Sequence, residues 1–210
     1  MTFRGNVVML TGAAGTGKST LSKEAAVRIH PLSLVDFGKL LLERKIAQGF
    51  TGLTYDRLRA ESATLITPED VKAADLHLID SLPRLRQRAH VLIDSHPVTR
   101  EQYGFRITHY SFDDLRRISL DAVVVTYCHP SNLVERHKSN PQGRPPISDV
   151  EAQHHMALQE AVAVHYAIVC GCPCFLLDTT ARSPSDLGVE LGRIFDGLGG
   201  KAEVSTISPG

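Results

Sequence analysis

The sequence has no excess of charge of either sign. Its 210 residues include 23 lysines and arginines and 23 aspartates and glutamates, so the formal net charge at pH 7 is zero. Proteins that bind nucleic acids or membrane surfaces through their overall charge carry a clear positive excess. The balance therefore argues against both kinds of partner, but it allows a local group of basic residues to bind a small phosphorylated molecule.

Long hydrophobic runs are absent as well. A membrane-spanning helix needs about 20 consecutive, predominantly apolar residues, and no segment approaches that length. Residues 1–10 contain one short apolar run before a glycine-rich turn, without the longer apolar stretch and cleavage site of a secretion signal. These absences predict a cytoplasmic protein with no membrane partner.

Cysteine is scarce, and in a cytoplasmic protein its four residues are expected to be reduced thiols. Cys170, Cys172 and Cys174 are spaced C-x-C-x-C, whereas structural zinc sites usually space paired ligands as C-x₂₋₄-C. Cys172 and Cys174 would share one face of a strand and could approach one metal ion. The pattern favours a helix end followed by a buried strand that uses cysteine as a small apolar residue. A metal site stays open as the alternative.

Short apolar segments alternate with segments of helical pattern along most of the chain. The expected strands span residues 5–11, 32–37, 90–94, 121–128 and 172–177. Continuous apolar strands separated by helices build a parallel sheet that is covered on both faces. The alternation therefore predicts an α/β fold with three layers, in which a doubly wound, five-stranded parallel sheet lies between helices.

The helical segments and the irregular ones together predict the domain organisation. Helices are expected over residues 18–30, 39–48, 68–88, 112–118, 130–138, 148–170 and 185–198. Residues 50–67 lack a clear pattern, and residues 139–147 form a loop rich in proline and glycine. We predict one domain over residues 1–198, with an insertion over about 38–88, a lid over about 137–148 and a flexible tail over 199–210.

The clearest motif follows the first predicted strand. Residues 12–20 read GAAGTGKST, which matches G-x-x-x-x-G-K-[ST] between a strand and a helix. The glycines let the backbone approach phosphate oxygens, and the helix N-terminus adds a partial positive charge. In such a P-loop, Lys18 reaches the β- and γ-phosphates and the Ser19 hydroxyl ligates Mg²⁺. The residues predicted to bind the nucleotide phosphates are Gly12, Gly15, Thr16, Gly17, Lys18, Ser19 and Thr20.

A magnesium ion held by a P-loop also needs a carboxylate from a neighbouring strand. Asp94 ends the predicted strand 90–94, at the place where a metal-orienting aspartate belongs. Asp36, at the end of the second predicted strand, is its rival. We assign Asp94 to the metal, together with Ser19, and Asp36 to the acceptor side.

Two classes of P-loop protein compete for this sequence: a phosphotransferase, and a GTPase or ATPase that acts as a switch or motor. The guanine-reading Asn-Lys-x-Asp element of GTPases is not found after the strand that ends at Cys128. Kinases of small acceptors need segments that close over both substrates and exclude water. Residues 50–67 and 139–148 suit that task, and arginines that match phosphate oxygens occur in or near them. They are Arg57, Arg59, Arg100, Arg136 and Arg144.

Several tracts together resemble the nucleoside monophosphate kinases, and most closely the archaeal-type adenylate kinases. Beside the P-loop, these tracts are VDFGKLL at residues 35–41, DRLR at 56–59, IDSHPVTR at 93–100 and LVER at 133–136. The resemblance extends from about residue 6 to residue 195. It implies a P-loop kinase fold that transfers the γ-phosphoryl group of ATP, with Mg²⁺, to a nucleoside monophosphate.

The resemblance also implies individual roles. Arg100 would hold the acceptor phosphate with help from Arg59, within an acceptor site that includes Asp36 and Gly38. Lys18, Arg136 and Arg144 would neutralise the transferring phosphoryl group. The backbone of residues 180–183 would contact the adenine of ATP.

Two positions depart from the family pattern. Arg144 is followed by Pro-Pro-Ile, where the family usually has a second lid arginine, and Glu160 aligns where the family usually has an arginine. A carboxylate there would repel a phosphate. The alternatives are therefore a kinase for a different small metabolite, or a slow P-loop ATPase with a regulatory or assembly role.

The histidines are interpreted mainly as surface or core-edge residues. His129 and His137 are about two helical turns apart, which is too far to share one metal ion from a single helix. The histidines of the segment 148–170 receive the same interpretation. His96, two residues after Asp94, is the one candidate for a functional role.

Overall fold

The computed structural model describes residues 3–101, 103–139, 141 and 146–199. Its central sheet has five parallel strands in the order β2-β3-β1-β6-β7. The strands are β1 (Val7–Gly12), β2 (Leu32–Asp36), β3 (His90–Asp94), β6 (Ala122–Tyr127) and β7 (Cys174–Asp178). All five were expected from the apolar segments, so the predicted doubly wound α/β fold is confirmed.

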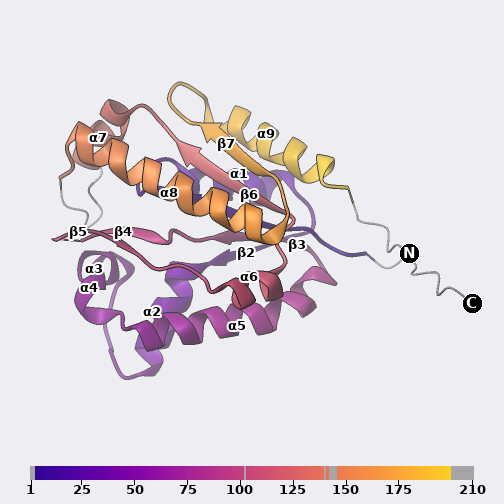
Figure 1. Ribbon diagram of the computed structural model, residues 1–210, viewed down its shortest axis with the longest axis horizontal. Helices are drawn as coiled ribbons and strands as arrows, with labels where there is room; N and C mark the ends of the chain where they lie inside the picture. Colours follow the sequence, from indigo (N-terminus) through magenta and orange to yellow (C-terminus); the bar gives the residue numbers. More distant parts are fainter. Residues whose placement is uncertain (1–2, 102, 140, 142–145, 200–210) are drawn as a thin grey trace, which may run out of the picture.

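Helices cover both faces of this sheet (Figure 1). They are α1 (Lys18–Arg28), α2 (Phe37–Ala47), α3 (Tyr55–Ala60), α4 (Ser62–Leu65), α5 (Pro68–Arg86), α6 (Phe112–Ile118), α7 (Pro130–Ser139), α8 (Asp149–Cys170) and α9 (Pro184–Gly197). Along β1, Val7 and Met9 pack with α5, α6 and α8, whereas Val8 and Leu10 pack with α1 and α9. This alternation follows from the two-residue period of a strand, and it produces the three layers.

Helix boundaries follow local capping chemistry. The Thr67 side chain accepts from the Asp70 backbone N–H and the Asp70 carboxylate accepts from the Thr67 N–H, a capping box that starts α5. Ser148 and Glu151 form the same motif at the start of α8. Pro83 lies inside α5, which continues through it as one helix to Arg86.

The prediction is wrong for part of the insertion and for one small sheet. Residues 50–67 are not irregular, because they contain the short helices α3 and α4. Residues 98–107 form an antiparallel hairpin of β4 (Val98–Glu101) and β5 (Gly104–Ile107). Helices and strands of four to six residues give too little periodicity for a sequence pattern to reveal them.

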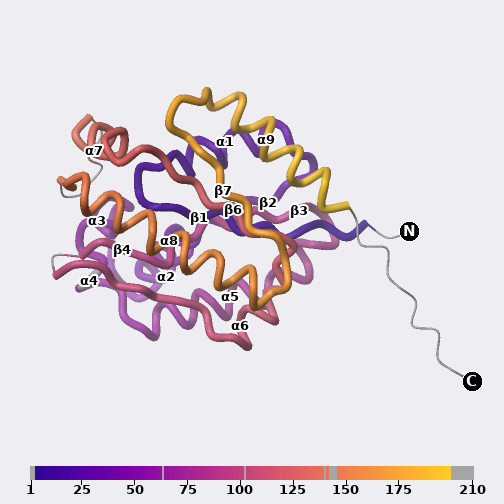
Figure 2. The backbone as a smooth tube through the Cα atoms, turned by 45° about the horizontal axis from the view of Figure 1, so that its top comes forward, coloured from indigo at the N-terminus to yellow at the C-terminus, as the bar shows by residue number. Residues whose placement is uncertain are grey.

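The short helices of the insertion, the hairpin and α7 gather at one end of the molecule. In the two views, α3, α4, β4 and α7 lie at the end where β1 leads into α1 (Figure 1, Figure 2). That end is the carboxyl edge of the parallel strands, where open α/β sheets bind their ligands. Within the described part of the chain, no helix combines the length and apolarity needed to cross a bilayer.

Candidate active site

The P-loop requires glycine at two positions where the backbone turns. Gly12 has a φ of 146° and Gly15 a φ of 94°, conformations that residues with a Cβ atom rarely adopt. A Cβ atom on Gly12 would overlap the side chain of Thr126 on β6. On Gly15 it would lie 2.9 Å from a methyl carbon of Leu133 on α7. The loop is therefore packed closely between its neighbours.

Lys18 and Ser19 begin α1 at the mouth of this loop. The Lys18 ammonium donates to the carbonyl oxygens of Gly12 at 2.5 Å and Ala13 at 3.2 Å. Gly17 caps α1 without a side chain, so the first N–H groups of the helix remain suited to an anion. Ser19 and Thr20 are exposed in the first turn.

Thr16 stabilises the P-loop by hydrogen bonds on the side away from the cavity. Its buried hydroxyl lies 2.7 Å from the Thr126 hydroxyl and donates to the Ala13 carbonyl at 2.8 Å. Gly12 and Thr16 do not line the cavity described below, unlike the other predicted P-loop residues. These two positions therefore shape the loop rather than face a ligand.

The two candidate carboxylates lie side by side on neighbouring strands. Asp36 and Asp94 are partners in the register of β2 and β3. Burial raises the pKa of Asp94, and the Lys18 charge opposes that rise. Asp36 instead caps α2 and accepts from the Tyr55 hydroxyl at 3.0 Å. Asp94 thus faces the P-loop and Asp36 faces the insertion.

Tyr55 and Arg59 extend this group into α3. A Cβ atom on Gly38 would overlap the Tyr55 hydroxyl, so the glycine makes room for the ring. The Arg59 guanidinium lies 4.0 Å from the centroid of that ring. Burial, with a smaller effect of Asp36, raises the pKa of Tyr55 to about 12. Tyr55 therefore remains a neutral hydrogen-bond donor to Asp36 at physiological pH.

Arg100 on β4 forms an ion pair that the sequence does not reveal. Its Nη2 atom lies 2.7 Å from a carboxylate oxygen of Glu151, the residue that also caps α8. Hydrogen bonds from Ser148 and Arg100 lower the pKa of Glu151 to about 2. Glu160, the carboxylate of concern in the sequence, does not line the cavity within the described residues and has Cys174 nearby.

Arg136 on α7 connects the P-loop to the segment after β7. Its guanidinium donates to the carbonyl oxygens of Gly15 at 3.2 Å and Thr179 at 2.9 Å. The predicted lid is described only at its ends, in α7 and just before α8, and Arg144 lies outside the described residues. The same holds for the predicted tail beyond Gly199.

Two buried histidines near the P-loop were not expected at the site. His137 and His155 each place Nε2 about 3 Å from a carbonyl oxygen, of Ala14 (2.8 Å) and Val98 (3.0 Å). Because a carbonyl only accepts, Nε2 carries the proton, and Nδ1 has no partner within the described residues. Burial lowers the pKa of His155 to about 4, so its ring is neutral. His155 and Gln159, one helical turn apart on α8, both donate to the Val98 carbonyl. Two polar residues on a buried helix face are the sequence feature that could have indicated this part of the site.

One cavity of about 620 Å³ brings these groups together. Of the residues singled out in the sequence, those that line it are Gly15, Gly17, Lys18, Ser19, Thr20, Asp36, Gly38, Arg59, Asp94, His96, Arg100 and Arg136. Others that line it, including Asp75, Arg106, Tyr110, His137 and His155, were not predicted. The cavity therefore has the P-loop on one wall and a second set of basic side chains on the insertion and hairpin.

The four cysteines lie outside this cavity as free thiols. All four are unpaired by disulfides, and Cys170 lies near Cys172. No group of three or more His, Cys, Asp or Glu side chains suited to a metal ion occurs among the residues that the structure describes.

A parallel sheet in this order, with a P-loop after its central strand, defines the class of P-loop kinases. Residues 11–153 match a family model described as an AAA domain, and the chain belongs to this family. Curated relatives include adenylate kinases of Thermococcus onnurineus (strain NA1) and Pyrococcus abyssi (strain GE5 / Orsay). They are 26% and 23% identical to the chain over 164 residues, which cover 77% of this chain and 80% of each relative.

Solved structures of low sequence identity share the fold. A putative kinase from Chloroflexus aurantiacus has a TM-score of 0.56 at 15% identity, over 94% of this chain and 99% of that one. Shikimate kinase from Acinetobacter baumannii has a TM-score of 0.56 at 14% identity, over 92% of this chain and 94% of that one. Thymidylate kinase from Candida albicans has a TM-score of 0.50 at 12% identity, over 92% of each chain. The chain is an ATP-dependent kinase, and its structural neighbours are named for different acceptors.

Proposed function

We propose that the protein transfers the γ-phosphoryl group of ATP to a nucleoside monophosphate. The observation that supports this proposal is the single cavity with the P-loop on one wall and Arg59, Arg100 and Arg106 on another. Two anionic groups can then be bound facing each other, as direct transfer between them requires. The sequence similarity to adenylate kinases favours a nucleotide as the acceptor.

The triphosphate would bind at the P-loop and the start of α1. Lys18 would contact the β- and γ-phosphates, and the Ser19 hydroxyl and the Asp94 carboxylate would hold Mg²⁺. An exposed hydroxyl and a carboxylate that line one cavity are oxygen ligands of the kind Mg²⁺ prefers. The ion would neutralise charge on the transferring phosphoryl group. The backbone of residues 180–183 is the proposed contact of the adenine ring.

The acceptor phosphate would bind at Arg100 and Arg59, with Asp36 and Gly38 shaping the site around Tyr55. Arg100 already holds a carboxylate, that of Glu151, so its guanidinium lies in a geometry that suits an anionic oxygen. A bound phosphate would share or replace the Glu151 contact.

Transfer needs no protein nucleophile. An oxygen of the acceptor phosphate attacks the γ-phosphorus as the bond to the β–γ bridging oxygen breaks, and ADP leaves with that oxygen. Lys18 and Arg136 would stabilise the charge that spreads over the transferring group, joined by Arg144 from the lid. We propose that the insertion over about 38–88 and the lid over about 137–148 close on this reaction within one domain.

A kinase for a different small metabolite is the second candidate. The ion pair between Arg100 and Glu151 favours it, because an acceptor without a phosphate would leave that pair intact. Shikimate kinase, among the structural neighbours, is named for a substrate of that kind.

The deciding experiment measures ADP formation from ATP and Mg²⁺ with a panel of nucleoside monophosphates, shikimate and sugars as acceptors. The proposal predicts that one or more monophosphates raise the rate of ADP formation by at least tenfold. A response to an unphosphorylated metabolite alone would favour the second candidate. ADP formation that no acceptor changes would favour a slow ATPase.

A further inference from the structure

The cavity extends past the arginines to a region that the proposed phosphate contacts do not use. Its lining there includes Phe37, Ile66 and Val71, which belong to one apolar cluster of the insertion. Tyr110 contacts Phe37 edge to face, with the ring centroids 6.3 Å apart. These side chains offer an apolar surface of the kind that binds a flat ring.

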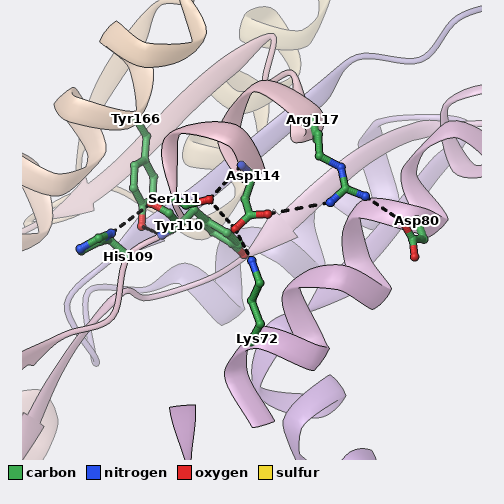
Figure 3. A network of polar contacts seen from close by, with 8 residues as sticks. All are labelled: Lys72, Asp80, His109, Tyr110, Ser111, Asp114, Arg117 and Tyr166. Carbon is green, nitrogen blue, oxygen red and sulfur yellow. Dashed lines mark hydrogen bonds and ion pairs between the residues drawn. The ribbon is translucent and has the colours of Figure 1, made fainter. Parts of the chain in front are cut away.

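Asp75 on α5 lines the same cavity. It is only 6% exposed, and it makes no hydrogen bond or ion pair within the described residues. Lys72 is the nearby cation, but its ammonium donates to Asp114 at 2.8 Å (Figure 3). Asp114 is also bonded by Ser111 at 2.6 Å. Lys72 and Asp114 are therefore paired with each other, and Asp75 has no ion-pair partner within the described residues.

The Tyr110 hydroxyl also lines the cavity and lies within electrostatic range of this carboxyl. It is buried, and Ser95 is its nearest hydrogen-bonding side chain. The backbone N–H of Tyr110 donates to the Tyr166 hydroxyl at 3.2 Å, which fixes the position of the residue (Figure 3). The Asp75 carboxyl and the Tyr110 hydroxyl thus both line the cavity, and Asp75 makes no hydrogen bond or ion pair within the described residues.

Groups of this kind lower the stability of a fold. A buried polar atom without a hydrogen bond costs roughly 1–3 kcal/mol, and a buried charge costs more. Burial, together with the charge of Asp114, raises the pKa of Asp75 to about 7. Most buried polar groups in proteins are satisfied, so a nearly buried carboxyl without a partner on a cavity wall indicates that a ligand completes it.

We infer that Asp75, with the Tyr110 hydroxyl, recognises an amino group on the base of the acceptor nucleotide. This inference rests on the proposed function, because it assumes that the acceptor phosphate lies at Arg59 and Arg100 and its ring on the apolar wall. A carboxyl group can accept from the exocyclic amino group of guanine, adenine or cytosine. Above pH 7, where the carboxyl is mostly ionised, it would face a carbonyl oxygen of uracil or thymine, and two acceptors repel. Asp75 is thus a specificity-determining residue for the base.

The test compares acceptors that differ at one amino or carbonyl group: CMP with UMP, and GMP with IMP. The kcat/KM for each is measured in the wild type and in Asp75→Asn. Asp80→Asn is the matched control, because Asp80 is exposed on the same helix and loses the same charge. The unfolding midpoint of each variant is measured as well.

The wild type is expected to favour the amino-bearing member of at least one pair by tenfold or more. Asp75→Asn removes the carboxylate charge and replaces one of its two acceptor oxygens with an amide donor, so that preference should fall at least tenfold, mainly through the acceptor KM. The KM for ATP should stay within twofold, and the unfolding midpoint should not fall. Asp80→Asn should keep the wild-type preference.

An unchanged preference in Asp75→Asn would overturn the inference and leave the proposed function intact. A lower unfolding midpoint with an equal loss for all acceptors would also overturn it, since Asp75 would then be a structural residue. If the wild type phosphorylates no monophosphate, the proposed function fails first and the inference fails with it.

Discussion

The two walls of the cavity are built differently. On the P-loop wall, Thr16 and Arg136 are bonded to the loop or its neighbouring strands within about 3 Å, and Lys18 returns to two loop carbonyls. On the opposite wall, Arg100 is paired to a partly exposed glutamate, and Asp75 has no partner within the described residues. The proposed triphosphate side is thus completed by the protein itself, whereas the proposed acceptor side contains groups that a ligand would complete.

This difference explains why motif and fold define the class but not the acceptor. A P-loop needs glycines and inward-pointing backbone N–H groups to bind phosphates, so it has a recognisable motif. The proposed acceptor wall comes from α3, α4 and the β4–β5 hairpin, short elements whose side chains can vary without changing the sheet. Structural neighbours with this fold are accordingly named for shikimate, thymidylate and sugars.

The largest expected effect is at the P-loop wall. Lys18→Ala should lower kcat by about 100- to 1,000-fold, because it removes the positive charge that would stabilise the transferring phosphoryl group. Lys23→Ala, at an exposed position of the same helix, is the control. A kcat of Lys18→Ala within a few-fold of the wild-type value would contradict the proposed role of Lys18 at the transferring phosphoryl group.

The second prediction concerns the pH dependence of stability. The pKa of Asp75 is about 7 in the folded protein against 3.8 for an unperturbed aspartate. A raised pKa means that its contribution to stability is fully present below about pH 4 and is lost as the pH rises through about 7. Each pKa unit corresponds to about 1.4 kcal/mol, so the loss is at most about 4 kcal/mol.

Urea unfolding of the wild type and Asp75→Asn between pH 4 and pH 8 measures this contribution. The variant should gain stability relative to the wild type as the pH rises over that window. A difference that stays constant with pH would show that Asp75 is compensated in the folded protein, contrary to the account of the acceptor wall.

A smaller effect is expected for the acceptor phosphate contact. Arg100→Met should raise the acceptor KM by about 10- to 100-fold, since a charge-assisted contact contributes roughly 1.5–3 kcal/mol. The KM for ATP should change little, because Arg100 lies on the other wall. Initial rates with each substrate varied in turn separate the two constants, and an equal rise in both would contradict the assignment of Arg100.

The smallest effect tests the competition between Glu151 and the acceptor. Glu151→Gln keeps an oxygen that can accept at the α8 capping box and removes the charge that pairs with Arg100. Because partly exposed ion pairs contribute only about 0–1 kcal/mol, the acceptor KM should fall about two- to fivefold. A rise in that KM would indicate that Glu151 positions Arg100 for the phosphate instead of competing with it.

The sequence predicts the P-loop wall better than the acceptor wall for physical reasons. The five strands, the α5 and α8 helix starts and the P-loop depend on local patterns that a single chain displays. Glu151 is recognisable as a capping residue, but its pairing with Arg100, 51 residues away, depends on packing of α8 against β4. Asp75 carries no sequence signal, since an aspartate on an amphipathic helix normally faces solvent.

Product analysis tests the central claim most directly. The protein is incubated with ATP, Mg²⁺ and each nucleoside monophosphate, and the phosphorus-containing products are followed by ³¹P NMR. The account predicts that, with at least one monophosphate, one acceptor diphosphate forms for each ADP released from ATP, and that inorganic phosphate stays low; with AMP this means two ADP for each ATP consumed. One ADP and one inorganic phosphate for each ATP consumed, with every acceptor left unchanged, would contradict it.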